Sequence, residues 1–176
     1  LIALAAAQKA EGLCGVILVA APGRKLGDLL REQLRSNPAN APVLDEALTA
    51  LASLEAGQRV DTSAMNPALL PLFAPQVQPF LIDLLAQDPA SMAAKLELPL
   101  LIVHGARDLQ VSDADSEALH KAQPRSRIVV IEGMNHVLKR VPSDDRAANM
   151  ATYADPSLPV EPKLVDAVAE FVRKAD

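Results

Sequence analysis

Two residues of the sequence have the types and positions needed for chemistry. Asp108 follows the apolar run at residues 98–103, and His136 follows the apolar run at residues 127–132. Ligands of open α/β sheets bind outside the carboxyl ends of the strands, so both side chains are placed to meet at one end of a sheet. A carboxylate beside an imidazole fixes its tautomer and stabilises the imidazolium that forms when the ring takes a proton. The pair is therefore a candidate acid and general base.

A nucleophile to complete this pair is not found in the sequence. None of the nine serines lies in a G-x-S-x-G elbow, and the segment GLCG around Cys14 is not a shifted form of one. Cys14 is interpreted as a small hydrophobe leading into a buried strand, because no nearby basic residue could activate a thiolate. The chain starts with an apolar helix at Leu1 rather than at Met, so we expect the native start and the nucleophile to lie upstream.

Other polar residues have simpler structural interpretations. His104, at a strand end, is expected to be a hydrogen-bonded structural histidine, and His120 is expected on a helix surface. Asp113 and Asp115 are alternative acids, but Ser112 followed by Asp115 three residues later predicts a capping box at a helix start. Three histidines without motif spacing predict no metal site, and no cofactor is expected.

Strands and helices alternate in the two outer parts of the chain. Buried helices and strands in this order predict right-handed crossovers and a parallel sheet. The first strand, GVILVA, should be buried on both faces, and its unpaired apolar edge favours a missing N-terminal half. The expected strands are 15–20, 98–103 and 127–132, and the expected helices are 1–10 (buried), 112–123 and 162–174 (amphipathic).

Residues 23–98 differ from the rest of the chain. They are helical and interrupted by prolines, with helices expected at 26–34, 43–56 and 80–87, and they have the pattern of an insertion.

Composition excludes several classes of function. A formal charge of -5, a pI near 5.2 and only four aromatic residues disfavour nucleic acid as a partner. A single cysteine fits a reducing compartment, so a cytoplasmic location is expected. The apolar opening at residues 1–7 is too short to span a bilayer, and no membrane span is expected.

The segments LPLLIVHGARD and SRIVVIEGMNH resemble the α/β-hydrolase family, in which an acid follows the strand after the cap and a histidine follows the last strand. The spacing of 136 minus 108, or 28 residues, fits this order. Asn135 departs from the family, since many relatives have a small glycine there. The resemblance implies an α/β fold with residues 1–22 and 99–176 as the C-terminal part of the core, 23–98 as a helical cap, and the N-terminal half of the core missing from this chain.

The resemblance also implies a function, closest to the serine-aminopeptidase-like and carboxylesterase-like branches. An upstream serine would attack a small-molecule acyl substrate such as a carboxylic ester, with His136 as base and then acid and Asp108 orienting it; both oxyanion-hole donors would lie upstream of Leu1. Peptidase, acyltransferase, dehalogenase and epoxide hydrolase chemistry stay open, as does a non-catalytic binding protein. The cap residues could line an apolar substrate pocket or form the cap's own core; they are Leu69, Leu70, Leu72, Phe73 and Phe80.

Overall fold

The chain forms two compact units in the computed structural model, which describes residues 1–9 and 11–174. The sheet unit comprises Leu1–Gly23 and the segment from Pro89 onward, and the helical unit comprises Arg24–Asp88. The expected first helix extends to Ala10, which lies outside the described residues. Each unit has its own hydrophobic core.

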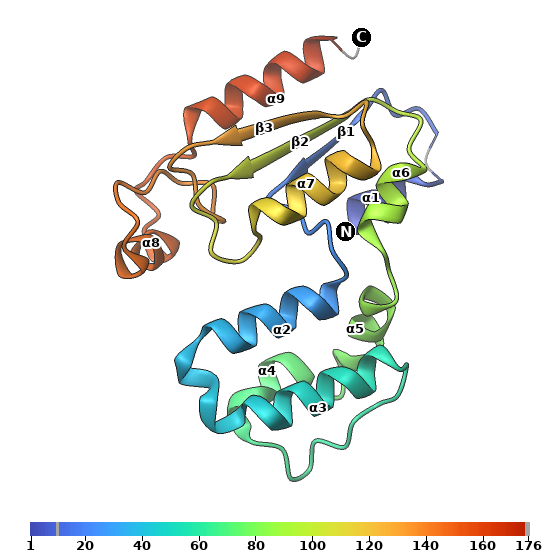
Figure 1. The fold of residues 1–176 in the computed structure, drawn as a ribbon, viewed down its shortest axis with the longest axis vertical. Helices are drawn as coiled ribbons and strands as arrows, with labels where there is room; N and C mark the ends of the chain where they lie inside the picture. Colours follow the sequence, from blue (N-terminus) through green and yellow to red (C-terminus); the bar gives the residue numbers. More distant parts are fainter. Residues whose placement is uncertain (10, 175–176) are drawn as a thin grey trace. The chain divides into compact units, whose positions relative to one another are not determined.

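Three parallel strands form the sheet, in the order β1-β2-β3 (Figure 1). They are β1 (Val16–Val19), β2 (Leu100–Gly105) and β3 (Arg127–Ile131). β1 pairs with β2 from Val16 opposite Leu100, and β2 pairs with β3 from Leu101 opposite Arg127. The predicted parallel sheet is confirmed, and its carboxyl ends bring the loops after β2 and β3 to one edge.

Helices cover both faces of this sheet. α7 (Asp113–Ala122), α1 (Ile2–Ala7) and α6 (Pro89–Ala94) lie on one face, and α9 (Pro162–Lys174) lies on the other (Figure 1). Side chains of β2 alternate between two cores, as a strand's period of two requires. Leu100 and Ile102 pack with Leu119 of α7, whereas Leu101 and Val103 pack with Leu164 of α9. α8 (Arg146–Ala151) and the 3-10 helix η3 (Thr152–Ala154) follow the loop after β3.

The first part of the chain is less buried than its sequence predicts. Only Leu4 of α1 is buried and Ile2 is 65% exposed, because α1 packs against α6 and β1 on one side only. Val16 and Leu18 of β1 are buried, whereas Ile17 and Val19 are half-buried against the core beside α9, so the second face is covered less completely than predicted. The expected burial of Cys14 is also wrong: it is exposed, in a bend before β1 begins.

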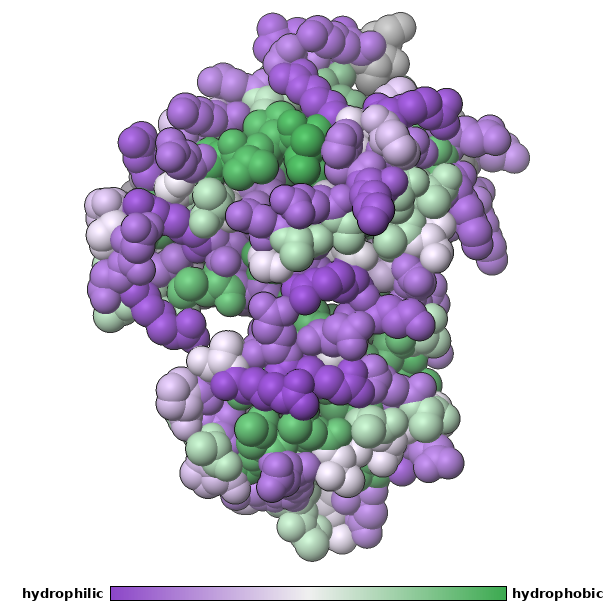
Figure 2. Space-filling model, viewed as in Figure 1, coloured by the Kyte–Doolittle hydropathy of each residue, from purple (hydrophilic) through white to green (hydrophobic). Residues whose placement is uncertain are grey.

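The edge at β3 is also partly open. Figure 2 shows apolar side chains at the surface of the sheet unit beside β3, and Val130 of this strand is 54% exposed. Arg127, at the start of β3, donates a hydrogen bond of 2.7 Å to Glu170 of α9, and Lys174 donates another of 2.7 Å to the same carboxylate. The bond from Arg127 ties α9 to β3, whereas the bond from Lys174 lies within α9.

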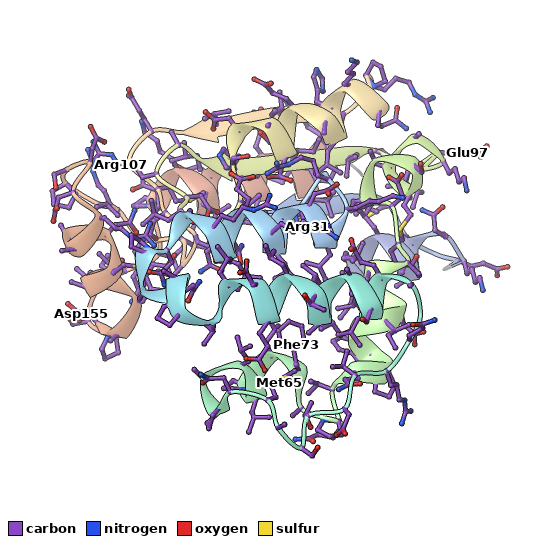
Figure 3. All side chains as sticks on the ribbon, turned by 60° about the horizontal axis from the view of Figure 1, so that its bottom comes forward. Arg31, Met65, Phe73, Glu97, Arg107 and Asp155 are labelled. Carbon is purple, nitrogen blue, oxygen red and sulfur yellow. The ribbon has the colours of Figure 1, made fainter. Side chains whose placement is uncertain are left out.

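The helical unit is built around leucine and phenylalanine side chains. Phe73 and Met65 lie in its core, between α3 (Leu44–Glu55) and the short helices that follow (Figure 3). Buried Gln78 donates to the carbonyls of Phe73 (2.8 Å) and Val60 (2.9 Å) and accepts from the Val60 N–H. The elements are α2 (Leu26–Ser36), η1 (Pro38–Val43), α3 (Leu44–Glu55), η2 (Pro67–Leu69), α4 (Leu70–Phe73) and α5 (Gln78–Leu85).

The structure bears on two expectations for residues 23–98: where the segment ends, and what its apolar side chains do. Residues 89–98 group with the sheet and not with the insertion, because Met92 and Leu96 pack into the core around Leu4 and Leu100. The apolar side chains at 69–73 are the unit's own core, since Leu69 and Phe73 are buried and their neighbours pack against the same cluster. Phe80 differs from them, being 56% exposed.

No single helix among the described residues has the length and apolar character to cross a membrane; the pair Pro67–Phe73 and Gln78–Leu85, bent by 63°, passes that test only when taken together.

Candidate active site

Asp108 stands in a tight loop at the end of β2. Its backbone N–H donates to the Gly105 carbonyl at 2.9 Å, and its side chain is fully buried. Oδ1 accepts from the backbone N–H groups of Gln110 (2.8 Å) and Val111 (2.9 Å), and Oδ2 lies 2.9 Å from Nδ1 of His136. Burying a carboxylate is unfavourable unless it is hydrogen-bonded, so these three partners explain how the side chain is held there.

His136 stands in the turn that follows β3. Gly133 opens this turn with φ 78°, its carbonyl accepts from the Val141 N–H at 2.8 Å, and Leu138 adopts φ 63°. The imidazole is 28% exposed. Because Asp108 is an acceptor, the ring is assigned Nδ1–H, which leaves a lone pair on Nε2. Within the described chain Nε2 has no hydrogen-bond partner, so it is free to accept a proton.

The loop after β2 carries Asp108 and is called the acid loop; the loop after β3 carries His136 and is called the histidine loop. The two loops meet through their backbones. The N–H groups of Ala106 and Arg107 donate to the carbonyls of Ile131 (3.1 Å) and Met134 (3.0 Å). A Cβ added to Gly105 would lie 2.3 Å from the Met134 carbonyl oxygen, a distance that non-bonded atoms do not adopt. Glycine at this position therefore allows the approach that brings Asp108 to His136.

Known proteins share this arrangement of sheet and flanking helices. The chain is 30% identical over 129 residues, 70% of its length, to the esterase EstD of Thermotoga maritima. Its structure is similar to that of BpoC of Mycobacterium tuberculosis, provisionally described as a non-heme bromoperoxidase, with TM-score 0.53, 15% identity and 99% of this chain covered. The chain belongs to the α/β-hydrolase fold family. It represents the C-terminal part of that fold.

The chain spans 29% of the length of EstD and 63% of BpoC. A thermophilic esterase of Thermogutta terrifontis is similar over 93% of this chain and 57% of its own, with 18% identity and TM-score 0.45. No protein-family model matches the chain.

A buried polar network beside the α/β-hydrolase loops was not predicted from sequence. Asn135, noted only as a departure from the family, is fully buried, and its Nδ2 donates to Asn149 Oδ1 (3.0 Å) and Thr152 Oγ1 (2.6 Å). Asn149 Nδ2 donates to the Arg107 carbonyl at 2.7 Å, and Lys139 Nζ donates to the Thr152 carbonyl at 2.9 Å. The only sequence signal was the unusual asparagine before the histidine, because its partners lie 14 and 17 residues away.

Tyr153 lies next to the acid loop. Its hydroxyl accepts a hydrogen bond from Gln110 Nε2 at 3.2 Å, and the backbone of Gln110 in turn donates to Asp108. Burial raises the pKa of Tyr153 above its usual 10, the bond from Gln110 opposes this shift, and the charge of Asp108 adds to it. Burial and the neighbouring carboxylate therefore both disfavour ionisation of this hydroxyl.

The other candidates have structural partners. His104 is buried, and its Nε2 lies 2.8 Å from Oδ1 of Asp113, in agreement with a hydrogen-bonded structural role. Asp115 is fully buried and accepts from the Ser112 N–H at 3.1 Å, completing the predicted capping box. His120 is half-buried and not simply on a helix surface, because its Nδ1 bonds Ser126 Oγ at 2.8 Å.

Over the described residues, no group of three or more His, Cys, Asp or Glu side chains is arranged to hold a metal ion.

Proposed function

We propose that this chain supplies the acid, Asp108, and the general base, His136, of a serine hydrolase that acts on a carboxylic ester or a related acyl compound. The observation that carries the proposal is the 2.9 Å contact between Asp108 Oδ2 and His136 Nδ1, with the carboxylate fully buried and the ring partly exposed. The 30% identity to EstD, an esterase, supports the choice of substrate class.

The proposed reaction uses Nε2 of His136 as the proton carrier. Nε2 takes the proton of a serine hydroxyl as that oxygen bonds to the acyl carbon, and the imidazolium formed is stabilised by Asp108. His136 then gives the proton to the leaving alcohol as the ester C–O bond breaks. Water repeats the sequence on the acyl-enzyme, with His136 again as base, and releases the acid product.

The serine and the oxyanion-hole donors are proposed to lie N-terminal to Leu1, in the other half of the same fold. Two facts support this: the chain spans 29% and 63% of the lengths of EstD and BpoC, and β1 pairs on one edge only among the described residues. The helical unit is proposed to be the cap. Phe80 is an apolar side chain of this unit that the unit's own core leaves exposed.

A cytoplasmic location is retained as part of the proposal, because exposed Cys14 is a free thiol and such thiols persist in reducing compartments. Separating cell fractions and blotting for the protein tests this directly.

A serine-directed fluorophosphonate tests the enzymatic proposal, using the protein expressed from the complete gene. One serine N-terminal to Leu1 should be labelled, as located by mass spectrometry of peptides, and the protein should hydrolyse p-nitrophenyl esters. His136→Ala should abolish both. His120→Ala is the matched control, since it removes a half-buried histidine bonded to Ser126, and should retain both. Labelling of a serine within residues 1–176, or activity that survives His136→Ala, would contradict the proposal.

A further inference from the structure

We infer that Asn149 is a positioning residue, which holds the acid loop and the histidine loop at their working distance through the side chain of Asn135. The inference rests on the proposed function for its kinetic consequence, and on the geometry alone for its spectroscopic one. Asn149 touches neither Asp108 nor His136; it is bonded to the residue that precedes each of them in the sequence.

The two asparagine side chains form a continuous connection. Asn149 Nδ2 donates 2.7 Å to the carbonyl of Arg107, the residue before Asp108. Asn149 Oδ1 accepts 3.0 Å from Nδ2 of Asn135, the residue before His136. Asn135 Oδ1 accepts 3.0 Å from the Lys139 N–H, across the turn that carries the histidine. The connection therefore runs from one loop of the pair to the other.

Both amides are hydrogen-bonded through their oxygen and their nitrogen, and both are shielded from water. Asn135 is 0% exposed and Asn149 is 4% exposed, so neither side chain can exchange its partners for solvent. Each uses its oxygen as an acceptor and its nitrogen as a donor, and the amide of Asn149 thereby donates to the Arg107 carbonyl and also accepts from Asn135. A buried polar group left without a partner is unfavourable, so displacement of either loop from these bonds is disfavoured.

The support for Asn149 is independent of the Asp108–His136 contact. Asp145 Oδ2 caps the start of α8 by accepting from the Ala148 N–H at 2.7 Å. Thr152 Oγ1 donates 2.8 Å to the Asn149 carbonyl, and Lys139 Nζ holds the Thr152 carbonyl. These bonds hold α8 and η3 in place, so that Asn149 can position the acid loop and the histidine loop.

Gln123 offers a matched comparison in the same unit. It is 5% exposed, and its Nε2 donates to the Leu96 carbonyl at 2.7 Å, so it too is a buried amide that holds a loop. That loop precedes β2, at the opposite end of the strands from Asp108. Figure 3 shows the two ends: Arg107 marks the end with the acid loop, and Glu97 marks the other.

The test compares Asn149→Leu with Gln123→Leu in the protein expressed from the complete gene. Asn149→Leu should lower kcat about 10- to 100-fold and change KM less than threefold, because a misplacement near 1 Å costs up to about 10²-fold. It should also broaden or abolish the downfield proton resonance of His136 Nδ1–H. Gln123→Leu should lower the unfolding midpoint to a similar extent, and leave kcat and the resonance unchanged.

Asn149→Asp covers the case in which the leucine variant does not fold. The ionised carboxylate keeps the side-chain shape and the acceptor for Asn135 but cannot donate to the Arg107 carbonyl. Asn149→Asp should therefore lower kcat and broaden or abolish the His136 resonance, as Asn149→Leu does. An unchanged resonance in the Asn149 variants would overturn the inference, as would an equal loss in Gln123→Leu. If the wild-type protein hydrolyses no ester, the proposed function fails, while the resonance still decides the role of Asn149.

Discussion

Replacing Gly105 by alanine should separate the acid and histidine loops. The added methyl carbon would lie 2.3 Å from the carbonyl oxygen of Met134 and 2.7 Å from its carbonyl carbon. Both are backbone atoms, so no side chain can rotate away to make room. Met134 is itself fully buried, which leaves the loops to move apart.

The size of the effect follows from these distances. Reaching the ordinary contact distance of 3.4 Å requires a shift of 3.4 minus 2.3, or 1.1 Å. Overpacking of this kind costs about 1–3 kcal/mol of unfolding free energy. The shift lies three residues before Asp108, whose contact with His136 is 2.9 Å, so a displacement near 1 Å predicts a loss of about 10²-fold in kcat.

The assay pairs urea unfolding with steady-state hydrolysis of a p-nitrophenyl ester, again in the protein from the complete gene. Gly57→Ala is the control: no atom lies within 4 Å of its added Cβ, and its φ of 76° makes alanine unfavourable by about 1–2 kcal/mol in the helical unit. The control should lose stability and keep kcat. The reasoning is refuted if Gly105→Ala keeps wild-type kcat, or if the two variants lose kcat equally.

Two further predictions concern titration. Tyr153 is the one tyrosine of this chain, and the difference in absorbance near 295 nm between wild type and Tyr153→Phe reports it in the protein from the complete gene. Its titration midpoint should lie above 10 in the folded protein and near 10 in urea. Gln110→Leu should raise the midpoint further, because it removes a bond that lowers the pKa. A midpoint at or below 10 would show that the ring is not buried. The hydrogen bonds from Arg127 and Lys174 lower the pKa of Glu170 from 4.5 to about 2, so its stabilising contribution is present above pH 4.5 and is lost as pH falls toward 2. The stability difference between wild type and Glu170→Gln should therefore close over that range in pH-dependent thermal unfolding, and a difference independent of pH would argue against the ion pairs.

Much of the sheet unit could be predicted because its signals are local. Three apolar runs became the three parallel strands, and Ser112 with Asp115 capped α7 as their spacing predicted. Asp108 and His136 came together because strand ends of a parallel sheet share one edge. Periodicity and turn chemistry are sufficient for these features.

Burial of side chains in residues 1–20 was harder to predict, because an apolar side chain favours burial but does not show whether other residues cover it. Most side chains of α1 and that of Cys14 remain uncovered, because whether a side chain is covered depends on neighbours that the local sequence does not specify. The network of Asn135 and Asn149 was missed for a related reason. Hydrogen bonds between polar side chains 14 residues apart leave no periodic pattern, and they follow only once the turn after β3 has been placed.

The central claim is that Asp108 orients His136 for proton transfer, and Asp108→Asn tests it most directly. The carboxamide oxygen can still accept the N–H groups of Gln110 and Val111, so the fold should persist. Its NH₂ group would instead donate to Nδ1, which moves the ring proton to Nε2 and removes the base. The account predicts a fall of about 10⁴-fold in kcat with an unfolding midpoint close to wild type. A kcat within threefold of wild type would contradict it.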